Sequence, residues 1–254
     1  MGWIAEFAGH GLARFLTTPV RRNTQVSTTT QEQLAAVLQP ADVLLIEGNT
    51  RISVPIKYLT QSTWSHAALY IGDALPAREP WQLPLTLIEA DLEEGIRGVT
   101  LAHYAYMHTR ICRAVNLSDE DRRRVVEYAV TRIGQQYDLK NVLDLARYLF
   151  PMPPIPTRYR RRMLTLGSGD PTRAICSTLI AQAFQSVHYP ILPEVRREWL
   201  DNPTYADFYA EIYRVRHHSL LVPRDFDISP FFQIIKPTIV NGFDYHSLTW
   251  DDAM

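Results

Sequence analysis

The order of secondary-structure signals along the chain restricts the fold more than any other feature of the sequence. Short apolar segments with strand character come first: residues 42–46, 65–71, 85–90 and 109–115. Helical spacing of apolar residues follows at 118–133 and 139–149, and a further helix carries Cys176. The last strand-like segments are residues 213–216 and 231–235. Strands and helices grouped in this way, without strict alternation, predict an α+β fold.

Composition limits the classes of protein to which the chain can belong. Its 254 residues are 46% hydrophobic and 21% charged, which is typical of a globular protein with a sizeable core. The formal net charge of −1 lacks the basic excess of a dedicated nucleic-acid-binding protein, so we expect no nucleic-acid partner. The two cysteines, Cys112 and Cys176, do not make a disulfide framework.

We divide the chain into an N-terminal segment, residues 1–38, and one domain, residues 39–254. Residues 1–18 place apolar side chains on one face of an amphipathic helix, and a polar linker follows. We expect this helix to pack on the domain or on a partner, with peripheral membrane contact as the alternative. Within the domain, a Pro/Arg-rich insertion spans residues 151–173, and a C-terminal extension begins at about residue 191.

Targeting signals are weak in this sequence. Glu6 interrupts the first segment, and no basic region precedes a continuous apolar run, so we predict no signal peptide. No uncharged stretch reaches the roughly 18 apolar residues of a transmembrane helix. We therefore expect a cytoplasmic protein that is soluble or peripheral to a membrane.

Cys176 lies where a loop rich in glycine and proline becomes a helix. A thiol near a helix N-terminus faces unpaired backbone N–H groups and the positive end of the helix dipole, which favour the nucleophilic thiolate. This position predicts a reactive cysteine, with a buried helix cysteine as the alternative. Cys112 lies within an alternating strand and is expected to be a small core residue.

A histidine and an acidic residue on neighbouring strand segments are candidate partners of this cysteine. His66 projects from a strand face, and histidine is a natural general base because its pKa lies near physiological pH. Glu89 lies on an apolar strand face, where a carboxylate needs a partner. Antiparallel pairing that sets Ile71 opposite Pro84 places His66 opposite Glu89. Asp91 is the rival partner on the same face.

Five segments of the sequence carry a more specific signal: residues 42–49 (DVLLIEGN), 58–73 (YLTQSTWSHAALYIGD), 88–90 (IEA), 134–138 (GQQYD) and 174–178 (AICST). Together they resemble the circularly permuted branch of the NlpC/P60 papain-like cysteine hydrolases, the YiiX-like group. In the ordinary branch the nucleophile precedes the histidine. In this chain the histidine strand comes first and the cysteine helix last, as in permuted members, and the resemblance covers residues 40–190.

The resemblance implies a papain-like core in which a small antiparallel sheet packs against the helix that carries the cysteine. It implies three catalytic residues: Cys176 as the nucleophile, His66 as the base and Glu89 as the group that orients the imidazole. It also implies that substrate contacts are made by Tyr137, Ser177 and Trp64.

The reaction implied is cleavage of an amide bond, peptide or N-acyl, through a thioester acyl-enzyme, with no metal or other cofactor. The substrate would be a small peptide, an N-acyl compound or a lipid-like molecule. A lipid-directed acyl hydrolase or acyltransferase and a catalytically inactive binding module stay open as alternatives. A metal site formed by His66, Glu89 and Cys176 is a third alternative, which lacks a supporting ligand pattern. The oligomeric state is not predicted.

Overall fold

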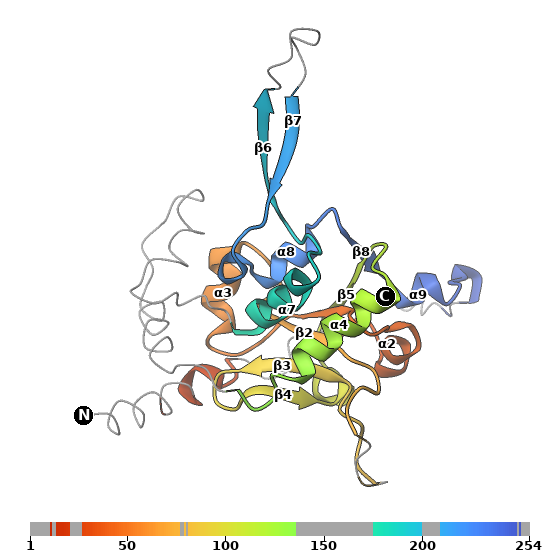
Figure 1. The fold of residues 1–254 in the computed structure, drawn as a ribbon. Helices are drawn as coiled ribbons and strands as arrows, with labels where there is room; N and C mark the ends of the chain where they lie inside the picture. The colour runs from red at the N-terminus through yellow and green to blue at the C-terminus, as the bar shows by residue number, and fades with distance from the viewer. Residues whose placement is uncertain are drawn as a thin grey trace.

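A six-stranded antiparallel sheet, in the order β4-β3-β2-β1-β5-β8, forms the centre of the computed structural model (Figure 1). Its strands are β1 (Val43–Ile46), β2 (His66–Tyr70), β3 (Leu87–Asp91), β4 (Gly95–Val99), β5 (Thr109–Ala114) and β8 (Phe232–Ile235). The structure describes residues 11, 14–20, 27–76, 79, 81–135, 175–199, 209–247 and 249. All pairs of neighbouring strands in the sheet are antiparallel.

Each face of this sheet has its own layer of helices. On one face, α4 (Asp119–Val130) and α7 (Ile175–Ser186) contribute to a core with alternate residues of the strands. On the other face, α2 (Gln31–Val37) and the 3₁₀ helix η1 (Leu101–Tyr104) cover a second core. Strand β1 supplies alternate residues to both cores, because successive side chains point to opposite faces of a sheet. The sheet is thus the middle of three layers, and the α+β prediction is confirmed.

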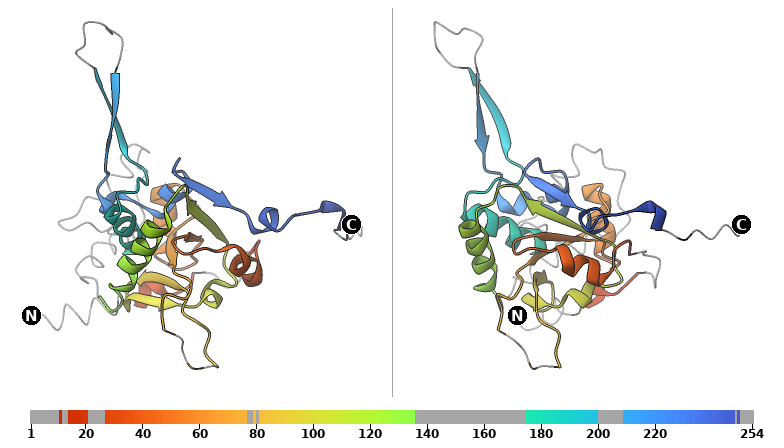
Figure 2. Two further views of the ribbon diagram at one scale, coloured as in Figure 1. Left: turned by 45° about the vertical axis from the view of Figure 1, so that its right-hand side comes forward. Right: turned by 90° about the vertical axis from the view of Figure 1, so that its right-hand side faces the viewer.

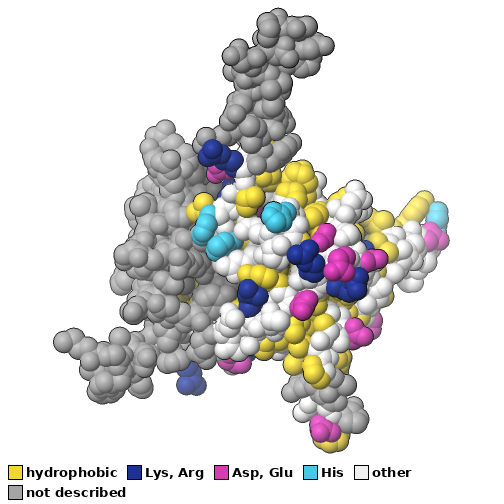
Figure 3. All heavy atoms as spheres, in the orientation of Figure 1, with side chains coloured by type: hydrophobic (Ala, Val, Ile, Leu, Met, Phe, Trp, Pro, Cys, Tyr) yellow, Lys and Arg dark blue, Asp and Glu magenta, His cyan; other side chains and the backbone are white. Residues whose placement is uncertain are grey.

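Helix α4 shows how the sequence produces this layering. Ser118 caps the helix, since its hydroxyl accepts a hydrogen bond from the Asp121 amide at 3.1 Å. Val125 and Ala129 are fully buried on the inner side. The outer side carries charges of both signs in i, i+3 ion pairs, for example Arg122 with Asp119 at 2.6 Å, and it forms a charged area in the space-filling view (Figure 3).

Two parts of the chain extend from this body. Strands β6 (Glu194–Trp199) and β7 (Tyr209–Arg214) pair as a separate two-stranded hairpin that projects away from the sheet (Figure 1). The segment with α9 (Pro237–Val240) and the 3₁₀ helix η4 (Tyr245–Ser247) projects in another direction (Figure 2).

The remaining helices lie beside the body. Helix α3 (Ser53–Thr60) follows β1, and α8 (Pro223–Asp227) precedes β8 with the 3₁₀ helix η3 (His218–Leu220) before it. No helix among the described residues is both long and apolar enough to cross a membrane.

The element predictions differ from the structure in three places. The strand predicted at residues 213–216 is instead β7, which begins and ends earlier because it pairs along its whole length with β6. Strands β4 and β6 were not predicted, since glycines flank the first and charged residues dominate the second. The helix predicted at 139–149 and the insertion at 151–173 lie outside the described residues, as does most of the predicted N-terminal helix, of which residues 14–17 are helical.

The predicted register of β2 and β3 is wrong by two residues. Leu69 pairs with Ile88, and Tyr70 pairs with Leu87, whereas the prediction set Ile71 opposite Pro84. A shift of two residues returns every side chain to its original face, so the apolar pattern cannot distinguish these registers. His66 and Glu89 therefore still share a face of the sheet.

Candidate active site

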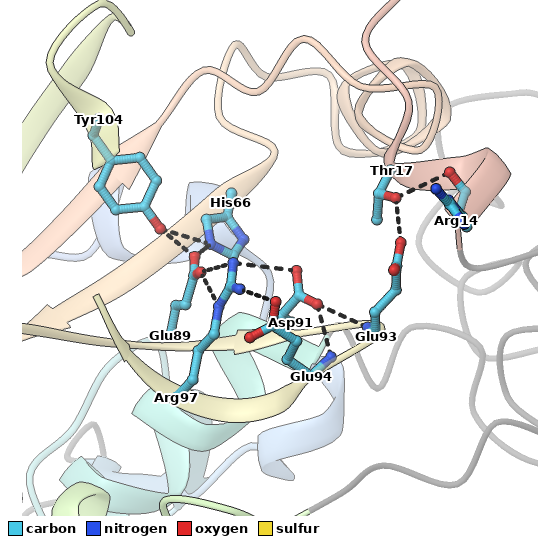
Figure 4. Close-up of polar contacts among 9 residues, drawn as sticks. All are labelled: Arg14, Thr17, His66, Glu89, Asp91, Glu93, Glu94, Arg97 and Tyr104. Atoms are coloured by element: carbon cyan, nitrogen blue, oxygen red, sulfur yellow. Dashed lines mark hydrogen bonds and ion pairs between the residues drawn. The ribbon is translucent and has the colours of Figure 1, made fainter. Parts of the chain in front are cut away.

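His66 and Glu89 form a direct contact between neighbouring strands. His66 is the first residue of β2, and its Nε2 atom lies 2.7 Å from Oε2 of Glu89 on β3 (Figure 4). The Glu89 side chain is only 4% exposed, whereas the His66 side chain is 26% exposed. The imidazole thus has a buried carboxylate on one side and partial access to solvent.

Two residues that the sequence analysis did not select complete the surroundings of Glu89. Arg97 on β4 donates to Oε1 from Nε at 2.9 Å, and its Nη2 lies 2.8 Å from the same oxygen. The hydroxyl of Tyr104, in η1, donates to Oε2 (Figure 4). Together with His66 Nε2, four donor atoms surround one carboxylate, which matches the four acceptor positions that a carboxylate offers.

These contacts determine the charge of Glu89. Burial raises the pKa of this carboxyl group, but its hydrogen bond to His66, the charge of His66, the Tyr104 hydroxyl and the Arg97 guanidinium together outweigh burial. The net result is a Glu89 pKa well below its ordinary value, so the group is ionised at neutral pH. An ionised carboxylate only accepts hydrogen bonds, so the proton of His66 lies on Nε2, and Nδ1 is the ring atom that can accept a proton.

The sequence contains a signal that would have found Arg97. Strands β3 and β4 form a tight hairpin around residues 92–94, and Glu89 pairs directly with Arg97 across it. Interpreting residues 92–94 as a hairpin turn would have placed the two side chains opposite each other. Tyr104 has no comparable signal, because it lies in a single 3₁₀ turn whose position depends on packing.

Cys176 is the second residue of α7, and its side chain and the predicted loop before the helix lie outside the described part of the structure. The neighbouring Ser177 anchors this end of the helix, because its hydroxyl donates to the backbone carbonyl of Leu221 at 2.8 Å. Leu221 lies two residues before α8, whose Asp227 accepts a hydrogen bond from the indole of Trp64 at 3.0 Å. Trp64 in turn lies two residues before His66.

The other end of α7 lies at the opposite end of the sheet. Phe184 contacts Phe232 with ring centroids 5.1 Å apart, and Phe232 pairs with Ala114, the last residue of β5. Strand β5 runs parallel to β2, because both are antiparallel to β1. The N-terminal end of α7 therefore lies at the end of the sheet where β2 begins with His66.

The faces of the sheet add a constraint on this arrangement. Helix α7 packs on one face, whereas Glu89, Arg97 and Tyr104 lie on the other, with the core that contains Leu87 and Val99. The His66 imidazole can therefore contact the Cys176 sulfur only around the end of β2. His66 is the first residue of that strand and so lies at this end.

Two of the predicted substrate-binding residues, Ser177 and Trp64, are buried in the structure. Ser177 is fully buried, with its hydroxyl bonded as described. Trp64 is 2% exposed and stacks on His108 with ring centroids 5.2 Å apart. Both side chains support the end of the sheet in this geometry, and substrate contact by them stays a prediction. Tyr137 lies outside the described residues.

The described residues contain no group of three or more histidine, cysteine, aspartate or glutamate side chains arranged to hold a metal ion. Cys176 is not among the side chains considered, so the metal alternative that includes it is not tested.

An antiparallel sheet with a strand histidine, followed along the chain by a cysteine helix that packs on the sheet, defines the papain-like class in permuted order. Residues 37–150 match the family model of permuted papain-like amidase enzymes of the YaeF/YiiX type, the C92 family. The predicted resemblance to the YiiX-like group is confirmed by this match. The match includes His66 and Glu89, whereas Cys176 lies beyond it.

Among solved structures, the chain is similar to the crystal structure of the metalloprotein yiiX from Escherichia coli O157:H7. The two share 15% sequence identity with a TM-score of 0.42, over 78% of this chain and 96% of that chain. No curated protein sequence matches the chain significantly. The family model assigns a general hydrolase class, because its members are described as amidases.

Proposed function

We propose that the protein is a cysteine hydrolase that cleaves an amide bond, with Cys176 as nucleophile and His66 as general base. The observation that carries this proposal is the 2.7 Å contact between His66 Nε2 and a Glu89 carboxylate that is buried and surrounded by four donors. Such a contact sets both the orientation and the tautomer of an imidazole, which a general base needs and a surface histidine lacks.

The proposed reaction has two stages. Nδ1 of His66 accepts the thiol proton of Cys176, and the thiolate attacks the carbonyl carbon to form a C–S bond. The imidazolium then gives its proton to the leaving nitrogen as the C–N bond breaks, which leaves a thioester. In the second stage His66 accepts a proton from water, the hydroxide attacks the thioester, and the acid product leaves as the thiol is restored.

Backbone N–H groups at the start of α7 are suited to stabilise the oxyanion of each tetrahedral intermediate. The first turn of a helix has N–H groups without an intrahelical partner, and these groups point along the helix axis. The amide of Cys176 itself is one of them. Glu89 stays ionised throughout and stabilises the imidazolium that forms between the two proton transfers.

The proposal is tested by activity-based labelling of the purified full chain with electrophilic amide and ester probes. We expect Cys176→Ala to lose both labelling and hydrolysis, and His66→Ala to lose hydrolysis while its backbone fold stays intact by circular dichroism. Comparison of the amide with the ester probe gives the preferred leaving group. Hydrolysis at the normal rate by Cys176→Ala would overturn the proposal.

A further inference from the structure

We propose that Arg97 is a positioning residue that holds the Glu89 carboxylate in the orientation that directs His66, and that Tyr104 assists it at the other carboxylate oxygen. This inference rests on the proposed function, because it concerns the base of that same reaction. Arg97 acts through Glu89, which it contacts at 2.8 and 2.9 Å, and we assign it no contact with substrate.

Arg97 is itself held by three carboxylates. Besides Glu89, its Nη1 lies 2.7 Å from Glu94, and its Nη2 lies 3.7 Å from Asp91 (Figure 4). Asp91 also accepts hydrogen bonds from the backbone amides of Glu93 and Glu94 at 2.8 and 3.0 Å, so the turn between β3 and β4 is built around it. Asp91 and Glu94 therefore hold the guanidinium in position for its contacts with Glu89.

The charged and titratable groups around Glu89 come from three elements. They are His66 from β2, Arg97 from β4 and Tyr104 from η1, with Asp91 and Glu94 behind the guanidinium. Arg97 is the group in this set whose positive charge does not depend on pH, because an arginine side chain stays protonated in proteins. Without it, a carboxylate that is 4% exposed would depend on a neutral hydroxyl and on the imidazole.

The loss of Arg97 would leave Oε1 of Glu89 without its two guanidinium donors. The hydrogen bonds with His66 and Tyr104 both involve Oε2, so they do not fix the rotation of the carboxylate. The carboxylate could then turn, and Oε2 would no longer hold Nε2 in one orientation. His66 and Tyr104 lower the pKa of Glu89 more than Arg97 does, so the group stays ionised and the proton of His66 stays on Nε2. Arg97 thus fixes the orientation of the base, whereas Glu89 sets its tautomer.

The test compares Arg97→Gln and Arg97→Lys with Arg113→Gln in the full chain. Arg113 is a matched control, because its guanidinium holds the buried Asp42 with contacts of 2.7 and 2.8 Å. Asp42 directly precedes β1 and so lies at the end of the sheet opposite His66. Loss of a buried ion pair alone affects both glutamine variants, whereas loss of the orientation of the base affects Arg97→Gln only.

We expect Arg97→Gln to lower kcat by about 10- to 100-fold, with KM within about 2-fold of the parent. Arg97→Lys, which keeps the charge, should recover part of this loss, and Arg113→Gln should keep the parent kcat. A second readout needs no turnover: the proton on Nε2 of His66 should resonate far downfield in the parent because of its short contact with Glu89, and it should move upfield in Arg97→Gln as that contact loosens. The Glu89 carboxyl ¹³C titration should move to higher pH in that variant.

An unchanged chemical shift of the Nε2 proton of His66 and an unchanged Glu89 titration in folded Arg97→Gln would overturn the inference. Equal loss of kcat in Arg97→Gln and Arg113→Gln, with no recovery in Arg97→Lys, would also overturn it. Both nuclear magnetic resonance readouts can be made in Cys176→Ala protein. The role of Arg97 can therefore be confirmed or rejected even if that variant is active and the proposed function fails.

Discussion

Nε2 of His66 lies 2.7 Å from Oε2 of Glu89, and this contact determines which nitrogen of the imidazole can act as a base. A second buried carboxylate beside the same sheet, that of Asp42, shows that an arginine partner does not by itself lower the pKa of a buried carboxyl group. Asp42 is held by Arg113 and by the amide of Gln39, and burial still raises its pKa. Glu89 has additional contacts with His66 and Tyr104, and its pKa is lowered. The polar neighbours of each carboxylate thus decide the direction in which its pKa shifts.

Thiol labelling should distinguish the two cysteines. Cys112 is fully buried on β5, and burial raises the pKa of its thiol, so little thiolate forms at neutral pH. We expect iodoacetamide to modify Cys176 in the native protein and Cys112 only after denaturation, as read by mass spectrometry of peptides. Cys112→Ser serves as the control and should be labelled like the parent. Modification of native Cys112 at a rate similar to Cys176 would contradict this assignment.

Glu89 should contribute stability in a particular pH range. Because its pKa is lower in the folded protein than the unfolded value of about 4.3, its contribution is fully present above that value. It is lost as the pH falls toward the folded pKa. We therefore expect the difference in the free energy of unfolding between the parent and Glu89→Gln to be largest at neutral pH and to shrink below about pH 4.

Urea titrations of both proteins between pH 3 and pH 7 measure this difference. A difference that stays constant across this range would show that Glu89 keeps the same protonation in the folded and unfolded chains. Glu127→Gln, at an exposed position on α4, provides a carboxylate control whose effect should be small throughout.

Gly48 lies where the chain leaves β1, and no larger residue fits there. A Cβ atom on Gly48 would collide with Oγ of Ser53 and would lie 2.7 Å from Oγ of Ser65, whose hydroxyl accepts a hydrogen bond from the Gly48 amide. We expect Gly48→Ala to lower the free energy of unfolding by about 1–3 kcal/mol, measured by thermal or urea denaturation. Gly11→Ala is the control, because a Cβ there meets nothing within 4 Å. Equal stability of the two variants would contradict this account.

Phe232 joins the last strand of the sheet to α7. Its side chain is 6% exposed and its ring lies against those of Phe184, Phe226 and Tyr189. Phe232→Ala should therefore cost about 3–5 kcal/mol of stability. Phe243→Ala removes a ring that is 54% exposed and should change stability by less than about 0.5 kcal/mol. Denaturation curves of the two variants give the comparison, and similar losses would show that the aromatic cluster is not part of the core.

The sequence predicted the elements that carry the proposed base and nucleophile because each has a strong local signal. The alternating segment around His66 became β2, and the helix predicted to carry Cys176 became α7. These signals depend on periodicity, on turn residues and on helix propensity, all of which are local properties of the chain.

The residues that surround Glu89 could not be predicted in the same way. The contact of Glu89 with Tyr104 joins a strand to a single 3₁₀ turn, whose position is set by packing rather than by a repeating pattern. Arg97 lies on a strand that begins with a glycine, which weakened its strand signal. The two-residue error between β2 and β3 has a similar cause, since both registers satisfy the same apolar alternation.

Strand β8 has a consequence for how the protein is made. It completes the sheet beside β5, although the cysteine helix and the projecting hairpin lie between these two strands in the chain. During translation, the edge of β5 that pairs with β8 therefore stays unpaired until residue 235 has left the ribosome. An unpaired apolar edge can associate with other nascent chains. We expect ribosome-bound chains that stop before β8 to need protection by chaperones. Once β8 has left the ribosome and paired with β5, this protection should no longer be needed.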